Sequence, residues 1–99
     1  MFFDWKKDSL SILDENSNML AQIGFKLINN EQTFVVERTF VTENARGLGL
    51  AGKITTYFLD DVSQQKKSII PLCSYTKSFI RKNPKYQILL AKDQTLEEE

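Results

Sequence analysis

The stretch Asn44-Ala45-Arg46-Gly47-Leu48-Gly49-Leu50-Ala51-Gly52 lies between a strand-like run and a helix-like run of residues. Two glycines one residue apart let backbone N–H groups turn toward an anion with no Cβ in the way. The helix that follows adds the positive end of its dipole. The stretch therefore predicts a cradle for a phosphate group, with a pyrophosphate as the natural ligand. A turn that only tightens the strand-to-helix connection is the alternative.

The same glycines satisfy the Gly-x-Gly-x-x-Gly string of dinucleotide-binding folds, but other features argue against that class. Such a fold needs two mononucleotide-binding halves and usually more than the 99 residues of this chain. It also needs an acidic residue roughly 20 positions after the glycines. At that place the chain reads Ile69-Ile70-Pro71-Leu72-Cys73, without a carboxylate. The phosphate-binding loop of nucleotide hydrolases is excluded as well, because no Gly-Lys-Ser or Gly-Lys-Thr closes the loop.

Composition predicts one domain over residues 1–99 and limits its partners. The 13 basic residues balance 13 acidic ones, so no global field draws the chain to nucleic acid or to a membrane surface. A small nucleic-acid-binding domain is further disfavoured because no aromatic-basic motif accompanies the lysines. The charged start of the chain lacks the apolar stretch of a signal peptide, and no apolar run approaches about 18 residues. These features predict a cytoplasmic location.

The single cysteine excludes an internal disulfide, and the chain has no histidine. Histidine is the commonest metal ligand and general base, so its absence argues against a protein metal site and excludes histidine-dependent triads.

Apolar periodicity predicts strands before the glycine loop and a strand–helix–strand unit around it. A short strand contains Leu10 and Ile12, and a hairpin leads to a second strand over residues 21–27, closed by Asn29-Asn30. Thr33–Val41 is apolar on both faces, as a central strand is, and leads into the loop. The spacing then predicts an amphipathic helix from Leu48 to about Lys66.

The short, apolar and β-branched segment 68–73 indicates a buried strand. We expect it to run parallel to Thr33–Val41, because a helix of this length is the standard parallel crossover. Pro71 lacks a ladder donor, which weakens the pairing and opens a gap next to the glycine loop. A second helix is expected to begin at the N-cap Ser74 and to end at Asn83-Pro84. Residues 86–90 are apolar in a pattern that fits helix or strand equally, and the tail from about residue 93 is expected to be frayed.

Three motifs together resemble the small, minimal members of the GCN5-related N-acetyltransferase superfamily. They are Arg46-Gly47-x-Gly49-x-Ala51, Pro71-x-Cys73-Ser74-Tyr75 and Lys82-Asn83-Pro84-x-Tyr86, and the resemblance runs from about Phe34 to Leu90. It implies an α+β fold in which antiparallel strands precede a strand, a phosphate loop, a helix, a parallel strand and a short helix. It also implies an acetyl-coenzyme A site, with the pyrophosphate on the loop amides and the pantetheine between the splayed parallel strands.

The resemblance implies an N-acetyltransferase that moves an acetyl group from acetyl-coenzyme A to an amine. A non-catalytic acyl-coenzyme A binding or sensing module is the alternative. Asn44 and Arg38-Thr39 depart from the family pattern, and the short chain implies an acceptor site that is open or is completed by a partner, such as a second copy. The acceptor, a small amine or a protein lysine, stays open. The residues expected to bind the donor are Val41, Arg46, Gly47, Leu48, Gly49, Leu50, Ala51, Ser74 and Lys82. One or more of Lys77, Arg81, Lys82 and Lys85 are expected to reach the 3′-phosphate.

Cys73 and Tyr75 are the candidate catalytic residues. Free cysteine is often a small buried hydrophobe, but Cys73 comes just before the predicted second helix, whose dipole favours a thiolate. Its thiolate could take the acetyl group from the thioester and pass it to the amine. In the competing mechanism the amine attacks directly, an N–H near Val41 holds the thioester oxygen, and Cys73 or Tyr75 protonates the departing thiolate. Tyr75 is otherwise a core aromatic with its hydroxyl at the surface.

Overall fold

Alternating apolar residues make the N-terminal half of the chain an antiparallel sheet. In the computed structural model, which describes residues 1–91, β1 (Phe2–Lys6), β2 (Ser9–Leu13), β3 (Met19–Ile28) and β4 (Thr33–Val41) pair in chain order. The predicted β2–β3 hairpin is confirmed, and the Asp14 carboxylate accepts the N–H groups of Asn16 at 2.8 Å and Asn18 at 2.9 Å in its turn. The predicted turn at Asn29-Asn30 is also confirmed, with both residues at positive φ. The tail predicted to fray lies outside the described residues.

β1 is a strand that the sequence analysis did not predict. Phe3 and Trp5 lie opposite Ile12 and Leu10 on β2, so they face the same side of the sheet as the core residues of that strand. The Trp5 ring lies 5.7 Å from the ring of Phe58 on the helix that packs behind the sheet. β1 therefore extends the core by one strand.

The second half of the chain confirms the predicted parallel crossover. α1 (Leu50–Gln64) leads to β5 (Ser68–Pro71), which pairs with β4 in parallel. β4 does not lead straight into the glycine loop, because a turn of 3₁₀ helix, η1 (Glu43–Ala45), comes between them. α2 (Ser74–Lys82) ends before Asn83-Pro84 as predicted. The segment left open as helix or strand is a second 3₁₀ helix, η2 (Pro84–Leu89), followed by one bridge from Leu90 to Ile69.

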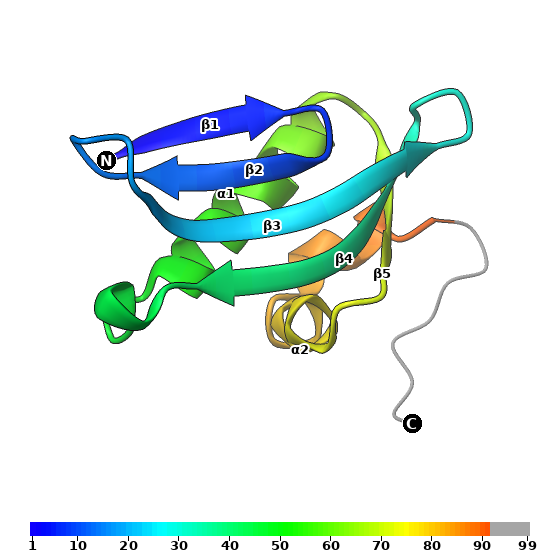
Figure 1. Ribbon diagram of the computed structural model, residues 1–99. Coiled ribbons are helices and arrows are strands. Elements are labelled where there is room, and N and C mark those ends of the chain that lie inside the picture. The colour runs from blue at the N-terminus through cyan, green and yellow to red at the C-terminus, as the bar shows by residue number, and fades with distance from the viewer. Residues whose placement is uncertain (92–99) are drawn as a thin grey trace.

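The core lies between the sheet and α1. The predicted apolar stripe of this helix is buried, and the Phe58 ring lies 5.3 Å from Phe34 and 5.7 Å from Phe25 on the sheet. In Figure 1, α1 crosses behind the sheet and α2 lies below β4, whereas no helix covers the front face in the described part of the chain. Residues 1–91 thus form one layer of sheet and one layer of helices.

The two parallel strands separate after a short ladder. β4 and β5 pair only from Thr33 to Val36, where Val36 lies opposite Pro71. The Val36 carbonyl then accepts two N–H groups, from Leu72 at 2.9 Å and from Cys73 at 3.1 Å. Beyond this point the stretch 37–41 of β4 has no β5 partner. The pairing therefore ends at Pro71, as its missing N–H predicts, and leaves a gap beside the second half of β4.

Candidate functional site

The glycine loop has the backbone geometry that its sequence predicts. Gly47 and Gly49 adopt φ values of +88° and +74°, in the left-handed region that favours glycine. A Cβ built on either residue meets no atom within 4 Å, so both glycines face open space. Gly49 is also the N-cap of α1. The loop thus presents bare backbone to the surroundings at the start of a helix.

The first backbone N–H groups of α1, next to this loop, have no hydrogen-bond acceptor within the helix. The first helical hydrogen bond of α1 runs from Lys53 N–H to Gly49 O at 3.1 Å, so the N–H groups of Leu50, Ala51 and Gly52 lack intrahelical acceptors. Such groups, together with the helix dipole, form an anion-binding site. A cavity of about 220 Å³ opens here and is lined by Val41, Ala45, Arg46, Gly47, Gly49, Leu50 and Ala51.

This cavity brings together most of the residues that the sequence predicts for donor binding. The Arg46 side chain folds back, and its Nε donates to the Val41 carbonyl at 3.4 Å. Leu48 does not line the cavity, and its side chain is 67% exposed. The cradle therefore consists of backbone and small side chains, with Leu48 projecting from its rim.

The register of β4 directs one more N–H group toward the gap. Val41 lies opposite Ala21 on β3, and the next N–H, of Thr42, donates to Leu20 O at 2.9 Å. In an antiparallel ladder this arrangement marks Val41 and Ala21 as a non-hydrogen-bonded pair. The N–H of Val41 therefore points away from β3, to the side where β5 no longer pairs.

Cys73 lies at the edge of the same gap. Its sulfur is 3.5 Å from the Thr39 hydroxyl on β4. Burial opposes ionisation of the thiol, but interactions with the Thr39 hydroxyl, with the N–H and hydroxyl of Thr76 and with the N–H of Tyr75 outweigh it and hold the pKa of Cys73 below its ordinary value. The thiol is therefore more readily ionised than a free cysteine.

The prediction that Ser74 caps α2 is wrong. Cys73 is the N-cap residue, in an extended conformation, and Ser74 is the first helical residue. The cause is the Val36 carbonyl, which fixes the backbone of Leu72 and Cys73 and so sets the helix start one residue earlier than the preference of serine indicates. The thiol thus lies at the helix N-terminus itself.

Tyr75 leans from α2 onto the start of α1. Its hydroxyl lies 3.8 Å from the position that a Cβ on Gly52 would take, and the side chain is 38% exposed. Burial and the nearby charge of Cys73 raise the pKa of Tyr75. The hydroxyl is thus protonated near neutral pH and lies between the glycine loop and the thiol-bearing helix.

The pair Arg38-Thr39 departs from the family pattern at Arg38. The side chains of Arg38 and Thr39 point to opposite faces of the sheet, because successive residues of a strand alternate. Thr39 contacts Cys73, whereas the Arg38 guanidinium crosses Gly24 on β3 and donates to Gln22 Oε1 at 3.0 Å. A Cβ at Gly24 would collide with this guanidinium. Arg38 is therefore held on the uncovered face, away from the thiol.

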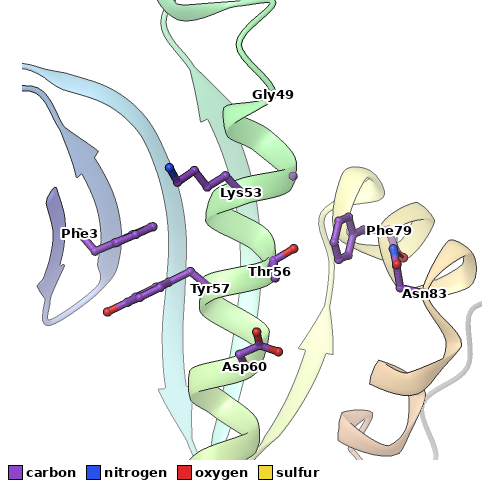
Figure 2. Close-up of a pocket in the computed structure, with 9 residues that line it drawn as sticks. Phe3, Gly49, Lys53, Thr56, Tyr57, Asp60, Phe79 and Asn83 are labelled. Atoms are coloured by element: carbon purple, nitrogen blue, oxygen red, sulfur yellow. Dashed lines mark hydrogen bonds between the residues drawn. The ribbon is translucent and has the colours of Figure 1, made fainter. Parts of the chain in front are cut away.

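A larger cavity of about 630 Å³ follows the outward face of α1 from the glycine loop (Figure 2). Phe3 flanks the helix on one side and Phe79 and Asn83 flank it on the other. Lys53 on α1 also lines this cavity. Lys82, which was predicted to bind the donor, is not among the lining residues, and it lies at the far end of α2 from Tyr75.

The sequence analysis assigned no site role to Thr39, Lys53, Asn83 or Thr76. For Asn83 a signal was available, since it stands in the Lys82-Asn83-Pro84 motif. Its side chain donates to Phe79 O at 2.8 Å and closes the end of α2. Within residues 1–91, no helix is long and apolar enough to cross a membrane, and no group of three or more His, Cys, Asp or Glu side chains could hold a metal ion.

Fold and site together define an α+β protein that offers an anion cradle beside a gap between two parallel strands. A profile of the GCN5-related N-acetyl-transferases matches residues 10–89. The chain belongs to the GCN5-related N-acetyltransferase family, as the resemblance indicated.

Two solved structures share this fold. One is the solution NMR structure of a GCN5-like protein from Staphylococcus aureus, with a TM-score of 0.67 and 21% sequence identity, covering 90% of this chain and 86% of that one. The other is the crystal structure of a mutant of the BH1408 protein from Bacillus halodurans, with a TM-score of 0.51 and 18% identity, covering 94% of this chain and 66% of that one. At these identities the likeness supports the fold, and the predicted α+β class is confirmed.

Proposed function

We propose that this protein transfers an acetyl group from acetyl-coenzyme A to an amine. The observation that carries the proposal is the cavity at the glycine loop, which is lined by Leu50 and Ala51 at the start of α1, where N–H groups lack acceptors within the helix, and by Val41 at the end of the unpaired stretch of β4. Thr39 on the same stretch contacts the Cys73 thiol. Two phosphates of the donor would bind these N–H groups, and its extended pantetheine arm would lie along the unpaired stretch 37–41 of β4. The reacting thioester would then lie near Thr39 and Cys73.

The gap offers groups for each part of the reaction. The N–H of Val41 would stabilise the negative charge that develops on the thioester oxygen when the amine attacks the carbonyl carbon. The C–S bond then breaks, and the coenzyme A thiolate takes a proton from Cys73 or Tyr75 while the amine releases one to water. In the covalent alternative, the Cys73 thiolate attacks the same carbon first and expels the coenzyme A thiolate, and the amine then displaces the Cys73 thiolate from the acetyl group while it releases a proton to water. The lowered pKa of Cys73 supports either role.

The larger cavity would accept the nucleotide end of the donor. It begins at Gly49, where the cradle lies, and Lys53 offers an ammonium group to a phosphate. Asn83 and Phe79 supply an amide and an aromatic ring on the opposite wall. Lys82 stays a second candidate for the 3′-phosphate.

The test is calorimetry with acetyl-coenzyme A, coenzyme A and a nicotinamide dinucleotide, followed by an assay for release of the coenzyme A thiol with a panel of amines. We expect the coenzyme A forms to bind and the dinucleotide not to bind, and at least one amine to release the thiol. Absence of coenzyme A binding would contradict the proposal.

A non-catalytic acyl-coenzyme A binding module is the second candidate. It is favoured by the front face of the sheet, which no helix covers in residues 1–91, so that the described chain does not enclose an acceptor. Binding of acetyl-coenzyme A without thiol release for any amine would support this candidate over the transferase.

A further inference from the structure

Thr76 carries a buried hydroxyl that the fold leaves without a partner. Its side chain is 1% exposed, and within the described residues its Oγ1 has no hydrogen-bond partner. A buried polar group that makes no hydrogen bond destabilises a protein by about 1–3 kcal/mol, so such groups call for an explanation. Valine would fill the same space without this cost.

The position of Thr76 on α2 supplies the explanation. Cys73 is the N-cap of this helix, which makes Thr76 the third helical residue. An N-cap side chain turns toward the backbone of the third helical residue, and residues three apart are neighbours on a helix. This position in the first turn brings the Thr76 side chain toward the sulfur of Cys73, and the pKa of the thiol responds to the Thr76 hydroxyl.

We propose that Thr76 is a positioning residue whose hydroxyl donates a hydrogen bond to the Cys73 thiolate. A neutral thiol is a weak acceptor, and in the described residues the Thr76 hydroxyl makes no hydrogen bond, whereas the Thr39 hydroxyl lies 3.5 Å from the sulfur. Ionisation turns the sulfur into a strong acceptor, and the buried hydroxyl then gains a charge-assisted hydrogen bond. With Thr39 on the other side, two hydroxyls from two elements hold the sulfur in the gap. This inference deepens the role that the proposed function gives to Cys73.

Other charged and titratable groups lie on the elements that adjoin the thiol. Tyr75 responds to the Cys73 charge through its own pKa. On β4, Glu37 pairs with Lys26 at 3.4 Å and Arg38 binds Gln22. The groups on the neighbouring elements are Tyr75 and Lys77 on α2, Glu37 and Arg38 on β4, Arg46 after η1 and Lys53 on α1. A change confined to Thr76 leaves all of them in place, so a shift in thiol ionisation reports on its hydroxyl.

The experiment measures thiol ionisation directly. Cys73 is the single cysteine, so the pH dependence of alkylation by iodoacetamide, followed by intact mass, reports on this residue alone. We expect Thr76→Val to raise the midpoint of the rate profile by about one pH unit, the size expected for a lost hydrogen bond to a charged group. Thr76→Ser keeps a hydroxyl and should keep the midpoint near that of the parent.

Thr55 provides a matched control. It is the other threonine whose hydroxyl is buried and unpartnered in the described residues, at 0% exposure, and it lies on α1. Thr55→Val removes an equivalent buried hydroxyl and should leave the midpoint unchanged. An unchanged midpoint in Thr76→Val, or an equal shift in Thr55→Val, would overturn the inference. The measurement uses neither acetyl-coenzyme A nor an amine. Its result can therefore be interpreted even if the protein proves not to be an acetyltransferase.

Discussion

The Thr39 hydroxyl and the Cys73 sulfur lie 3.5 Å apart and join β4 to the start of α2 across the point where β4 and β5 separate. Thr39 is on the stretch of β4 that has no β5 partner, and Cys73 follows Pro71, the last residue of the parallel ladder, by two positions. The contact therefore places a readily ionised thiol against the backbone that β5 leaves unpaired.

Replacing Cys73 tests its catalytic role. We expect Cys73→Ala to lower the rate of acetyl transfer by about 10²-fold or more, the usual range for a lost acid, base or nucleophile, while coenzyme A affinity stays close to that of the parent. Thiol-release kinetics and calorimetry measure the two quantities. Incubation with acetyl-coenzyme A and peptide mapping should show a thioester on Cys73 if the residue is a nucleophile. Full activity in Cys73→Ala would leave direct attack, with Tyr75 or water as the proton source.

Gly49 allows the charge of the cradle to be tested apart from its shape. Gly49→Asp and Gly49→Asn add side chains of nearly equal size, and both residues tolerate the left-handed φ of +74° better than other side chains do. We expect Gly49→Asp to bind coenzyme A roughly tenfold more weakly than Gly49→Asn, because only the carboxylate repels the pyrophosphate. Equal affinities in calorimetry would mean that the pyrophosphate binds elsewhere.

Lys53 and Lys82 are the two candidates for the 3′-phosphate. Because Lys53 lines the cavity that begins at the cradle, we expect Lys53→Gln to remove most of the preference of the protein for coenzyme A over its dephospho form, an effect of roughly tenfold for a charge-assisted contact. Lys82→Gln is the matched control. Loss of the preference in Lys82→Gln instead would support the residue chosen from the sequence.

Tyr86 makes stability depend on pH in the alkaline range. Its hydroxyl donates to Asp60 Oδ1 at 2.8 Å, and burial together with the hydrogen bond and charge of Asp60 raises its pKa to about 12. A raised folded-state pKa means that the stabilisation is complete below the ordinary value of 10 and is lost as pH rises toward 12.

We therefore expect Tyr86→Phe to lower the free energy of unfolding near neutral pH by about 1 kcal/mol and to weaken the alkaline loss. Urea unfolding below and above pH 10 measures both effects. Tyr57→Phe, which alters an exposed tyrosine, is the control. An alkaline loss of the same size in Tyr86→Phe as in the parent would contradict the assignment.

Local pattern was sufficient to predict the crossover and the cradle. Three features follow from the residues at their own positions. The apolar stripe of α1 follows from residue spacing, the turn at Asn29-Asn30 from the tolerance of asparagine for a left-handed backbone, and the end of pairing at Pro71 from its missing N–H. β1 was missed because Phe2 is exposed beside the inward Phe3 and Trp5, which hides the alternation.

The remaining differences depend on contacts between distant residues. Ser74 has the better capping preference, yet the Val36 carbonyl, far away in sequence, fixes Cys73 as the N-cap. Lys53 lies on the polar face of α1, and only the position of Phe79 and Asn83 opposite that face makes it part of a cavity. Periodicity identifies which face is polar but does not show what lies opposite it.

The doubly engaged Val36 carbonyl also limits how this chain can vary in length. One oxygen holds both Leu72 and Cys73, so the number of residues between the last ladder pair and the start of α2 is set by a single acceptor. An inserted or deleted residue at this corner would rotate the first turn of α2 by about 100° relative to β4, since each helical residue turns by that angle. The thiol would then leave Thr39, although the sheet and α1 could still form. We therefore expect loops elsewhere in this protein to tolerate insertions that this corner cannot.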